Sequence, residues 1–118
     1  MGSTIVGVLT ETSIRVGSEA TDGIDLPVVR ERTTGYPVIL GSGLKGALRQ
    51  RAEDVWGPDE PKVKEIFGEP DQAGAVSVTD ARLLLLPVRS LQGPFRWVTC
   101  PYVLDRYRRD CRLGGTAL

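Results

Sequence analysis

The pattern of hydrophobic and polar positions predicts short strands along the chain. Residues 4–10 are rich in β-branched side chains, which is typical of a buried strand. Residues 75–86 begin with Val76 and Val78 alternating with polar neighbours, and they predict one long strand or two strands with a bend. Residues 95–99 predict a further short strand.

Helical periodicity predicts three helical segments. Ser42 is a good N-cap for a helix over residues 44–56, a short helical turn is expected over 61–67, and a basic amphipathic helix is expected over 103–112. Residues 114–118 are expected to form a frayed tail. The predicted apolar face of the first helix comprises Leu44, Ala47, Leu48, Ala52 and Val55.

The order of these elements predicts an α+β fold. Strand, helix, strand, strand and helix make up most of the ferredoxin-like (RRM-like) β-α-β-β-α-β plan, with the final strand missing. One sheet edge would then be left open. A length of 118 residues is enough for one domain, so residues 1–118 are predicted to form a single modified ferredoxin-like domain.

Composition excludes several kinds of chemistry. The chain has no His, which excludes His-based acid–base catalysis, the Ser-His and Cys-His nucleophile systems and most zinc sites. Its two cysteines, Cys100 and Cys111, have neither zinc-ribbon spacing nor a second pair, so they are interpreted as reduced thiols. No apolar run is long enough for a membrane span and no secretory signal is visible. A cytoplasmic location without membrane contact is therefore expected.

Charge is balanced overall but uneven along the chain. Fifteen basic and fifteen acidic residues give a net charge of zero, which carries no signal for nucleic acid. Residues 96–118 nevertheless hold five arginines against two aspartates. For the four arginines of the last predicted helix, a solvated face is the favoured interpretation, and RNA or subunit contact is the second. These arginines are Arg106, Arg108, Arg109 and Arg112.

One motif carries a resemblance to a known family. Residues 41–49, Gly-Ser-Gly-Leu-Lys-Gly-Ala-Leu-Arg, resemble the Gly-Ser-Ser-Leu-Lys-Gly-x-x-Arg motif of the RAMP superfamily, the RNA-binding proteins of CRISPR systems. Further segments, in the same order, are similar to the backbone subunits of type III-B (Cmr) CRISPR effector complexes. These segments are residues 25–39, 67–68, 74–75, 79–84, 86–91 and 97–101.

The resemblance implies a function in RNA-guided defence. Such subunits polymerise along a CRISPR guide RNA, join other Cmr subunits, and cleave the complementary target single-stranded RNA with a divalent metal. The loop aspartate that matches is Asp25, which the resemblance makes the catalytic and metal-binding residue, with Mg²⁺ or another divalent cation as cofactor. The chain is shorter than family members and is expected to correspond to their N-terminal portion.

Asp25 also has a simpler interpretation. An aspartate before Leu-Pro in a polar loop is usually a turn residue. A carboxylate does suit Mg²⁺, which binds through few protein ligands together with waters and phosphate oxygens. Two hypotheses therefore stay open: a metal-dependent endoribonuclease within the assembled complex, or a non-catalytic structural RNA-binding and assembly module.

The motif over residues 41–49 predicts contacts with the RNA backbone. Lys45 suits a phosphate, and Arg49, one turn further along, suits an adjacent phosphate. An ordinary helix is the alternative. For Arg30 and Arg32 a solvated strand edge competes with RNA contact. The glycines that would let the backbone approach RNA closely are Gly41, Gly43 and Gly46, and Ser42 is a further predicted RNA-binding residue.

Overall fold

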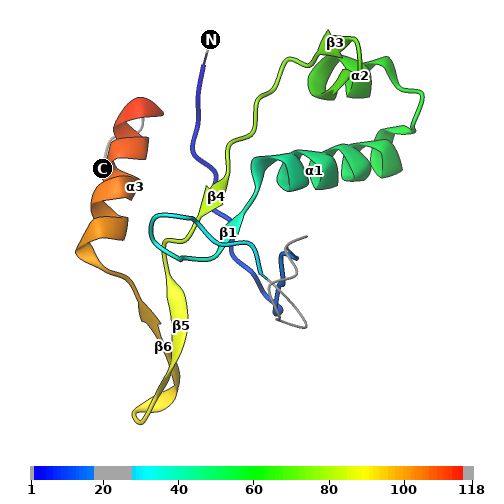
Figure 1. Ribbon diagram of the computed structural model, residues 1–118. Helices are drawn as coiled ribbons and strands as arrows, with labels where there is room; N and C mark the ends of the chain where they lie inside the picture. The colour runs from blue at the N-terminus through cyan, green and yellow to red at the C-terminus, as the bar shows by residue number, and fades with distance from the viewer. Residues whose placement is uncertain (1, 18–27, 116–118) are drawn as a thin grey trace. The chain divides into compact units, whose positions relative to one another are not determined.

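The computed structural model describes residues 2–17 and 28–115, which form short helices and strands (Figure 1). Chain contacts divide the molecule into two compact units, residues 15–82 and residues 1–14 together with 83–118. The helices are α1 (Gly41–Trp56), α2 (Pro61–Phe67) and α3 (Pro101–Leu113). The strands are β1 (Val38–Ile39), β2 (Gly68–Glu69), β3 (Gln72–Ala73), β4 (Ala81–Arg82), β5 (Leu86–Ser90) and β6 (Gly93–Val98).

The unit of residues 15–82 is built on the contact between α1 and α2. Val63 of α2 is fully buried, and Val38 of β1 is nearly so. Burial of one such side chain contributes roughly 1.5–3 kcal/mol. Strands β1 and β4 pair antiparallel, with Ile39 opposite Ala81. Because β1 leads directly into α1, this pairing brings the segment before β4 to the start of the helix.

Local sequence sets the ends of both helices in this unit. Helix α1 ends at Gly57, which has a φ of 100° that few other residues adopt. Helix α2 begins with Pro61, whose missing N–H costs nothing in a first turn, and ends at Gly68 with a φ of 87°. The helices predicted over residues 44–56 and 61–67 are therefore confirmed.

The other unit contains the β5–β6 hairpin and α3. Leu86 lies opposite Val98 in the antiparallel pair, and the register shifts between Val88 and Ser90. The helix predicted over residues 103–112 is confirmed as α3. One of its four arginines does not belong to a solvated face. Arg106 is buried, donates to the Leu83 carbonyl at 3.5 Å and lies 5.6 Å from the ring centre of Tyr102, so its charge faces the protein.

The two cysteines differ in burial. Cys111 is fully buried in α3, whereas Cys100, just before α3, is half-buried, and neither forms a disulfide bond. A hydrogen bond with Cys111 raises the pKa of the Tyr107 phenol above its ordinary value. The interpretation of both cysteines as reduced thiols agrees with this arrangement.

The strand prediction was wrong for two segments. Residues 4–10 form no strand, and Val6 and Leu9 are 76% and 74% exposed. A β-branched run becomes a strand only where a neighbouring backbone pairs with it, and no described residue does so here. In residues 75–86 only Ala81–Arg82 and Leu86 belong to strands. The Val76 N–H donates to the Ile66 carbonyl, and Val78 and Thr79 lie against Gly41 of α1.

The mixed class of helices and strands is confirmed, while the ferredoxin-like sheet stays a prediction. The described strands pair as three two-stranded sheets, β1 with β4, β2 with β3, and β5 with β6. No helix in the described ranges is long and apolar enough to cross a membrane.

Candidate RNA-binding site

The first turn of α1 is held against the segment that precedes β4. Gly41 is buried, and a Cβ at this position would overlap the Val78 carbonyl oxygen and lie 2.8 Å from the Thr79 carbonyl carbon. The Gly41 N–H donates to Asp80 Oδ1 at 2.7 Å. A carboxylate at this end of a helix satisfies one unpaired N–H and opposes the helix dipole favourably. Glycine at 41 is thus required by a close backbone approach.

The expected cap of this helix was misplaced. Ser42 lies exposed within the first turn, and the residue before the helix is Leu40, whose side chain makes no capping bond. Asp80, distant in sequence, supplies the acceptor instead. The prediction that Ser42 caps the helix was wrong because a tertiary contact replaced the local one.

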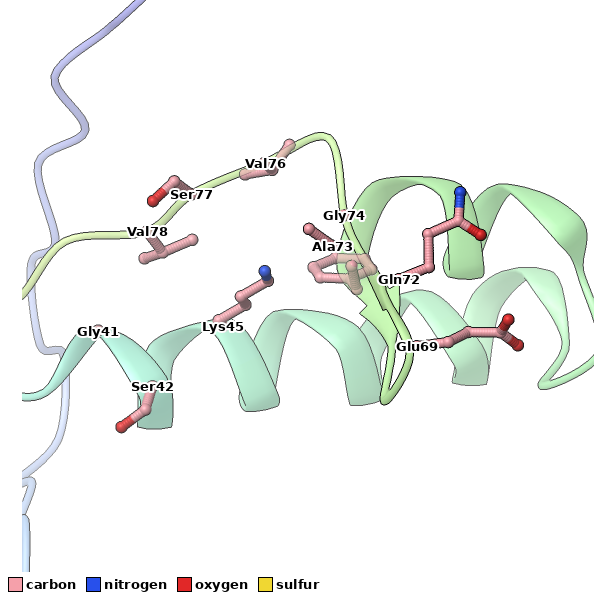
Figure 2. Close-up of a pocket in the computed structure, with 11 residues that line it drawn as sticks. Gly41, Ser42, Lys45, Glu69, Gln72, Ala73, Gly74, Val76, Ser77 and Val78 are labelled. Atoms are coloured by element: carbon pink, nitrogen blue, oxygen red, sulfur yellow. The ribbon is translucent and has the colours of Figure 1, made fainter.

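An open pocket of about 430 Å³ lies beside this turn (Figure 2). Lys45 extends from α1 into the space between residues 76–78 and the β2–β3 hairpin. Its side chain is half-buried, and no described residue forms an ion pair with it. The residues around the pocket are Gly41, Ser42, Lys45, Phe67, Glu69, Gln72, Ala73, Gly74, Val76, Ser77 and Val78.

The charges of this pocket favour an anion. Glu69 is the carboxylate among the lining residues, and it pairs with Lys64 at 3.2 Å, which offsets its charge. Lys45 supplies a cation without such a partner in the described part of the chain. The Lys45 ammonium group suits a phosphate oxygen.

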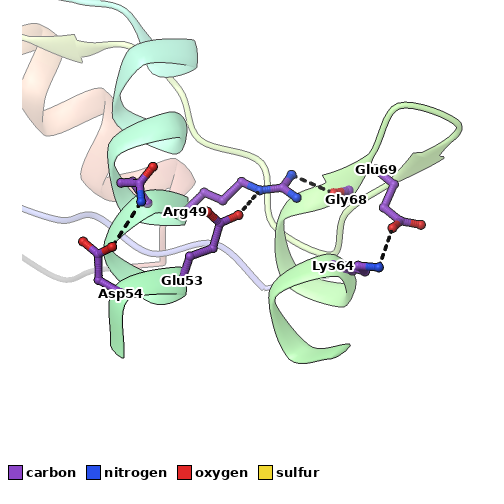
Figure 3. A network of polar contacts seen from close by, with 7 residues as sticks. Arg49, Glu53, Asp54, Lys64, Gly68 and Glu69 are labelled. Carbon is purple, nitrogen blue, oxygen red and sulfur yellow. Dashed lines mark hydrogen bonds and ion pairs between the residues drawn. The ribbon is translucent and has the colours of Figure 1, made fainter. Parts of the chain in front are cut away.

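Arg49 connects α1 to the wall of the pocket (Figure 3). Its Nε donates to Glu53 Oε1 at 2.9 Å and its Nη1 donates to the Gly68 carbonyl at 2.9 Å. The guanidinium therefore fixes β2 to the helix. The role of Arg49 at a phosphate, predicted from its motif position, would compete with these two bonds.

Replacing Arg49 with alanine is expected to lower the free energy of unfolding by about 1 kcal/mol, because it leaves the Gly68 carbonyl without its donor. Gln50→Ala is the matched control, since it removes an exposed bond to Asp54 on the same helix and should change stability by less than ~0.5 kcal/mol. Urea unfolding followed by circular dichroism measures both values. Equal losses in the two variants would show that the bond to Gly68 is not a structural tie.

The other predicted RNA-binding residues are spread over the unit. Gly43 and Gly46 are exposed on α1, with open space where a Cβ would stand. Arg30 is exposed and donates to the Gly35 carbonyl at 3.0 Å, and Arg32 is exposed in the following turn. Of the predicted set, Gly41, Ser42 and Lys45 are brought together at the pocket.

The predicted catalytic residue Asp25 lies outside the described residues. Within residues 2–17 and 28–115, no group of three or more Asp, Glu or Cys side chains is placed to hold a metal ion. The assignment of Asp25 as the residue that binds a divalent cation therefore stays a prediction.

Two structural features of the site were missed from the sequence. Asp80 follows the alternating Val76 and Val78, and an aspartate that interrupts a strand pattern is a signal for a capping role. Gly68 and Gly74 cross so closely that a Cβ on Gly68 would lie 2.6 Å from the Gly74 nitrogen. This crossing shapes the β2–β3 hairpin. The feature of the sequence that indicates it is the pair of glycines, Gly68 and Gly74, that bound the hairpin.

A second, apolar groove of about 330 Å³ lies on the same unit. It contains part of the apolar face predicted for α1, including the exposed side chains of Leu48 (53%) and Val55 (59%). The other residues around it are Arg51, Ala52, Trp56, Ile66, Phe67 and Val76.

Comparisons with known proteins point to one family. The model of the RAMP superfamily matches residues 2–112. The CRISPR system Cmr endoribonuclease Cmr4 of Pyrococcus furiosus is 46% identical over 121 residues, which cover 98% of this chain and 41% of that protein. The chain therefore spans less than half the length of this relative.

Solved structures agree with the sequence match. Oligomeric Cmr4 from Pyrococcus furiosus superposes with a TM-score of 0.71 and 51% identity, covering 78% of this chain and 35% of the other. A chain of the type III-B Cmr-beta complex bound to cognate target RNA gives a TM-score of 0.65 and 25% identity, covering 85% of this chain and 38% of the other.

Proposed function

This chain belongs to the RAMP superfamily, and from that membership we propose that it is part of the backbone subunit of a type III-B CRISPR effector complex. In this proposal it binds guide RNA, contacts further copies of itself and other Cmr subunits, and places target RNA for cleavage. The 46% identity to Cmr4 over nearly the whole chain supports the assignment. The single observation in the structure that carries it is Lys45, extended into a pocket at the start of α1 without a partner for its charge among the described residues.

The proposed contact is with the RNA backbone. Lys45 holds a phosphate by charge, and the exposed glycines Gly43 and Gly46 let the strand approach α1 closely. Arg30 and Arg32 are exposed cations of the same unit and add further phosphate contacts. Arg49 supports the pocket through β2 rather than through RNA. Contacts of this kind give affinity with little dependence on base sequence.

Cleavage of the target is assigned to Asp25 with a divalent cation. A bound Mg²⁺ would activate the attacking oxygen or stabilise the leaving one. The part of this chain in that chemistry is to anchor the cation by one carboxylate, while the RNA strand is held in place by Lys45 and its neighbours.

The proposed scaffold is a single domain with the ferredoxin-like element order.

Lys45→Ala is expected to weaken binding of single-stranded RNA by a similar factor for unrelated sequences. Because one phosphate contact is lost, the slope of log affinity against log salt should fall by about 0.7, the value for one charge on a single strand. Alanine is a good helix residue, so α1 should be retained. Fluorescence anisotropy at several salt concentrations measures both quantities.

The matched control for this prediction is Lys62→Ala, which removes an exposed lysine of α2 in the same unit. It should leave the affinity and the salt slope nearly unchanged. A strong preference of the unmodified chain for one RNA sequence, or a slope that Lys45→Ala does not alter, would contradict the backbone contact.

A further inference from the structure

We propose that Asp80 is a positioning residue of this RNA site, and that its two properties act in opposite directions. As a hydrogen-bond acceptor it fixes the first turn of α1, and as an anion it weakens the attraction of the turn for phosphate. The inference rests on the proposed function, since it concerns how the same pocket attracts RNA.

The positioning effect follows from the contacts of Gly41. The N–H of Gly41 donates to Asp80 Oδ1 at 2.7 Å, and the absence of a Cβ lets the turn lie directly on residues 78–79. Gly41, Ser42 and Lys45 all line the pocket. Loss of the Asp80 acceptor would release the turn that carries these residues, and the pocket would lose its defined edge.

The electrostatic effect follows from where the carboxylate lies. Its oxygen accepts the hydrogen bond of an N–H at the N-terminal end of α1, and that N–H would otherwise attract an anion. Asp80 is an exposed residue, so its charge is partly screened, but it lies against Gly41, which lines the same pocket as Lys45. A phosphate at the N-terminal end of α1 must therefore bind the backbone N–H groups that follow Gly41, together with Lys45. The negative charge of Asp80 opposes that binding.

Two substitutions separate these effects. Asp80→Asn keeps an oxygen that can accept the Gly41 N–H and removes the charge. Asp80→Ala removes both the acceptor and the charge. A purely structural role predicts no gain from either variant, whereas a purely electrostatic role predicts a gain from both.

The experiment measures binding of a fluorescent single-stranded RNA to the full chain by anisotropy. Asp80→Asn should tighten binding about two- to fivefold at low salt, the range given by one charge at a helix end, and the gain should shrink as salt rises. Asp80→Ala should bind more weakly than the unmodified chain. Asp59→Asn, the same charge change in the exposed turn after α1, should have a smaller effect than Asp80→Asn.

Amide hydrogen exchange at Gly41 gives a readout that needs no RNA. Protection should persist in Asp80→Asn and be lost in Asp80→Ala. If both variants shift RNA affinity in the same direction, or if Gly41 stays protected in Asp80→Ala, the proposal is overturned. If the unmodified chain binds no RNA at all, the proposed function fails, and the exchange result alone decides whether Asp80 holds the turn.

Discussion

Asp25→Asn in the assembled complex is expected to reduce cleavage of guide-complementary RNA by at least ~10³-fold, while guide and target binding stay nearly unchanged. Asparagine keeps the shape of the side chain but loses the charge that attracts a divalent cation. Binding is retained because Lys45 and the neighbouring donors, rather than Asp25, hold the phosphates in this proposal. Single-turnover cleavage with Mg²⁺, alongside a binding assay on the same samples, measures both properties.

Asp22→Asn is the matched control for this experiment, since it makes the same change three positions earlier. It should cleave at nearly the unmodified rate. Undiminished cleavage by Asp25→Asn would remove this residue from the mechanism. A parallel loss of binding would make Asp25 structural, and the hypothesis of a non-catalytic assembly module would then be preferred.

Gly68→Ala is expected to lower the free energy of unfolding by about 3 kcal/mol or more. Two costs add. A φ of 87° strains any residue with a Cβ, and that Cβ would lie 2.6 Å from the Gly74 nitrogen and 2.7 Å from the Gln72 carbonyl oxygen. Both of these atoms belong to the backbone, so neither can rotate away. Because β2 and β3 form a wall of the pocket, RNA affinity should fall with stability.

Gly46→Ala provides the opposite case on the same unit. Nothing lies within 4 Å of the position of its Cβ, and it stands in the exposed interior of α1. Alanine should therefore raise the free energy of unfolding by up to ~1 kcal/mol. Chemical denaturation of both variants tests the pair, and a similar loss from both would show that the crossing at Gly68 is not responsible.

The helices were largely predictable because their determinants are local. Gly57, Pro61 and Gly68 limit α1 and α2 by backbone geometry that any fold would have to respect. The α3 segment likewise combined a helical pattern with a proline at its start. The pattern could not predict that the Arg106 side chain is buried, because its hydrogen-bond acceptor, the Leu83 carbonyl, belongs to a different segment.

The strands were less predictable because pairing is not a local property. Residues 4–10 carry a strong strand preference, yet nothing in their own sequence specifies a partner. In residues 75–86 the alternation of Val76 and Val78 was outweighed by the close approach of Gly41. The segment lies against α1 there, a contact that only a three-dimensional arrangement reveals.

The candidate site likewise contains residues that the sequence predicted and residues that it did not. Lys45 was found from a motif, and its place in a pocket is consistent with that prediction. Arg49 was also assigned to phosphate from the motif, and that role stays a prediction, while its bonds to Glu53 and Gly68 give it a structural role that the motif did not indicate. Asp80, the acceptor for Gly41, was not assigned a role, because thirty-nine positions separate the two residues.

The unequal burial of the two cysteines makes α3 a convenient place for a spectroscopic label. Cys111 is fully enclosed, whereas Cys100 is half-buried immediately before the helix. A thiolate must reach a reagent in order to react, so a maleimide dye will modify Cys100 in preference to Cys111. The native sequence thus offers one attachment point for a dye, without any engineered cysteine, in a unit separate from the one that contains Lys45.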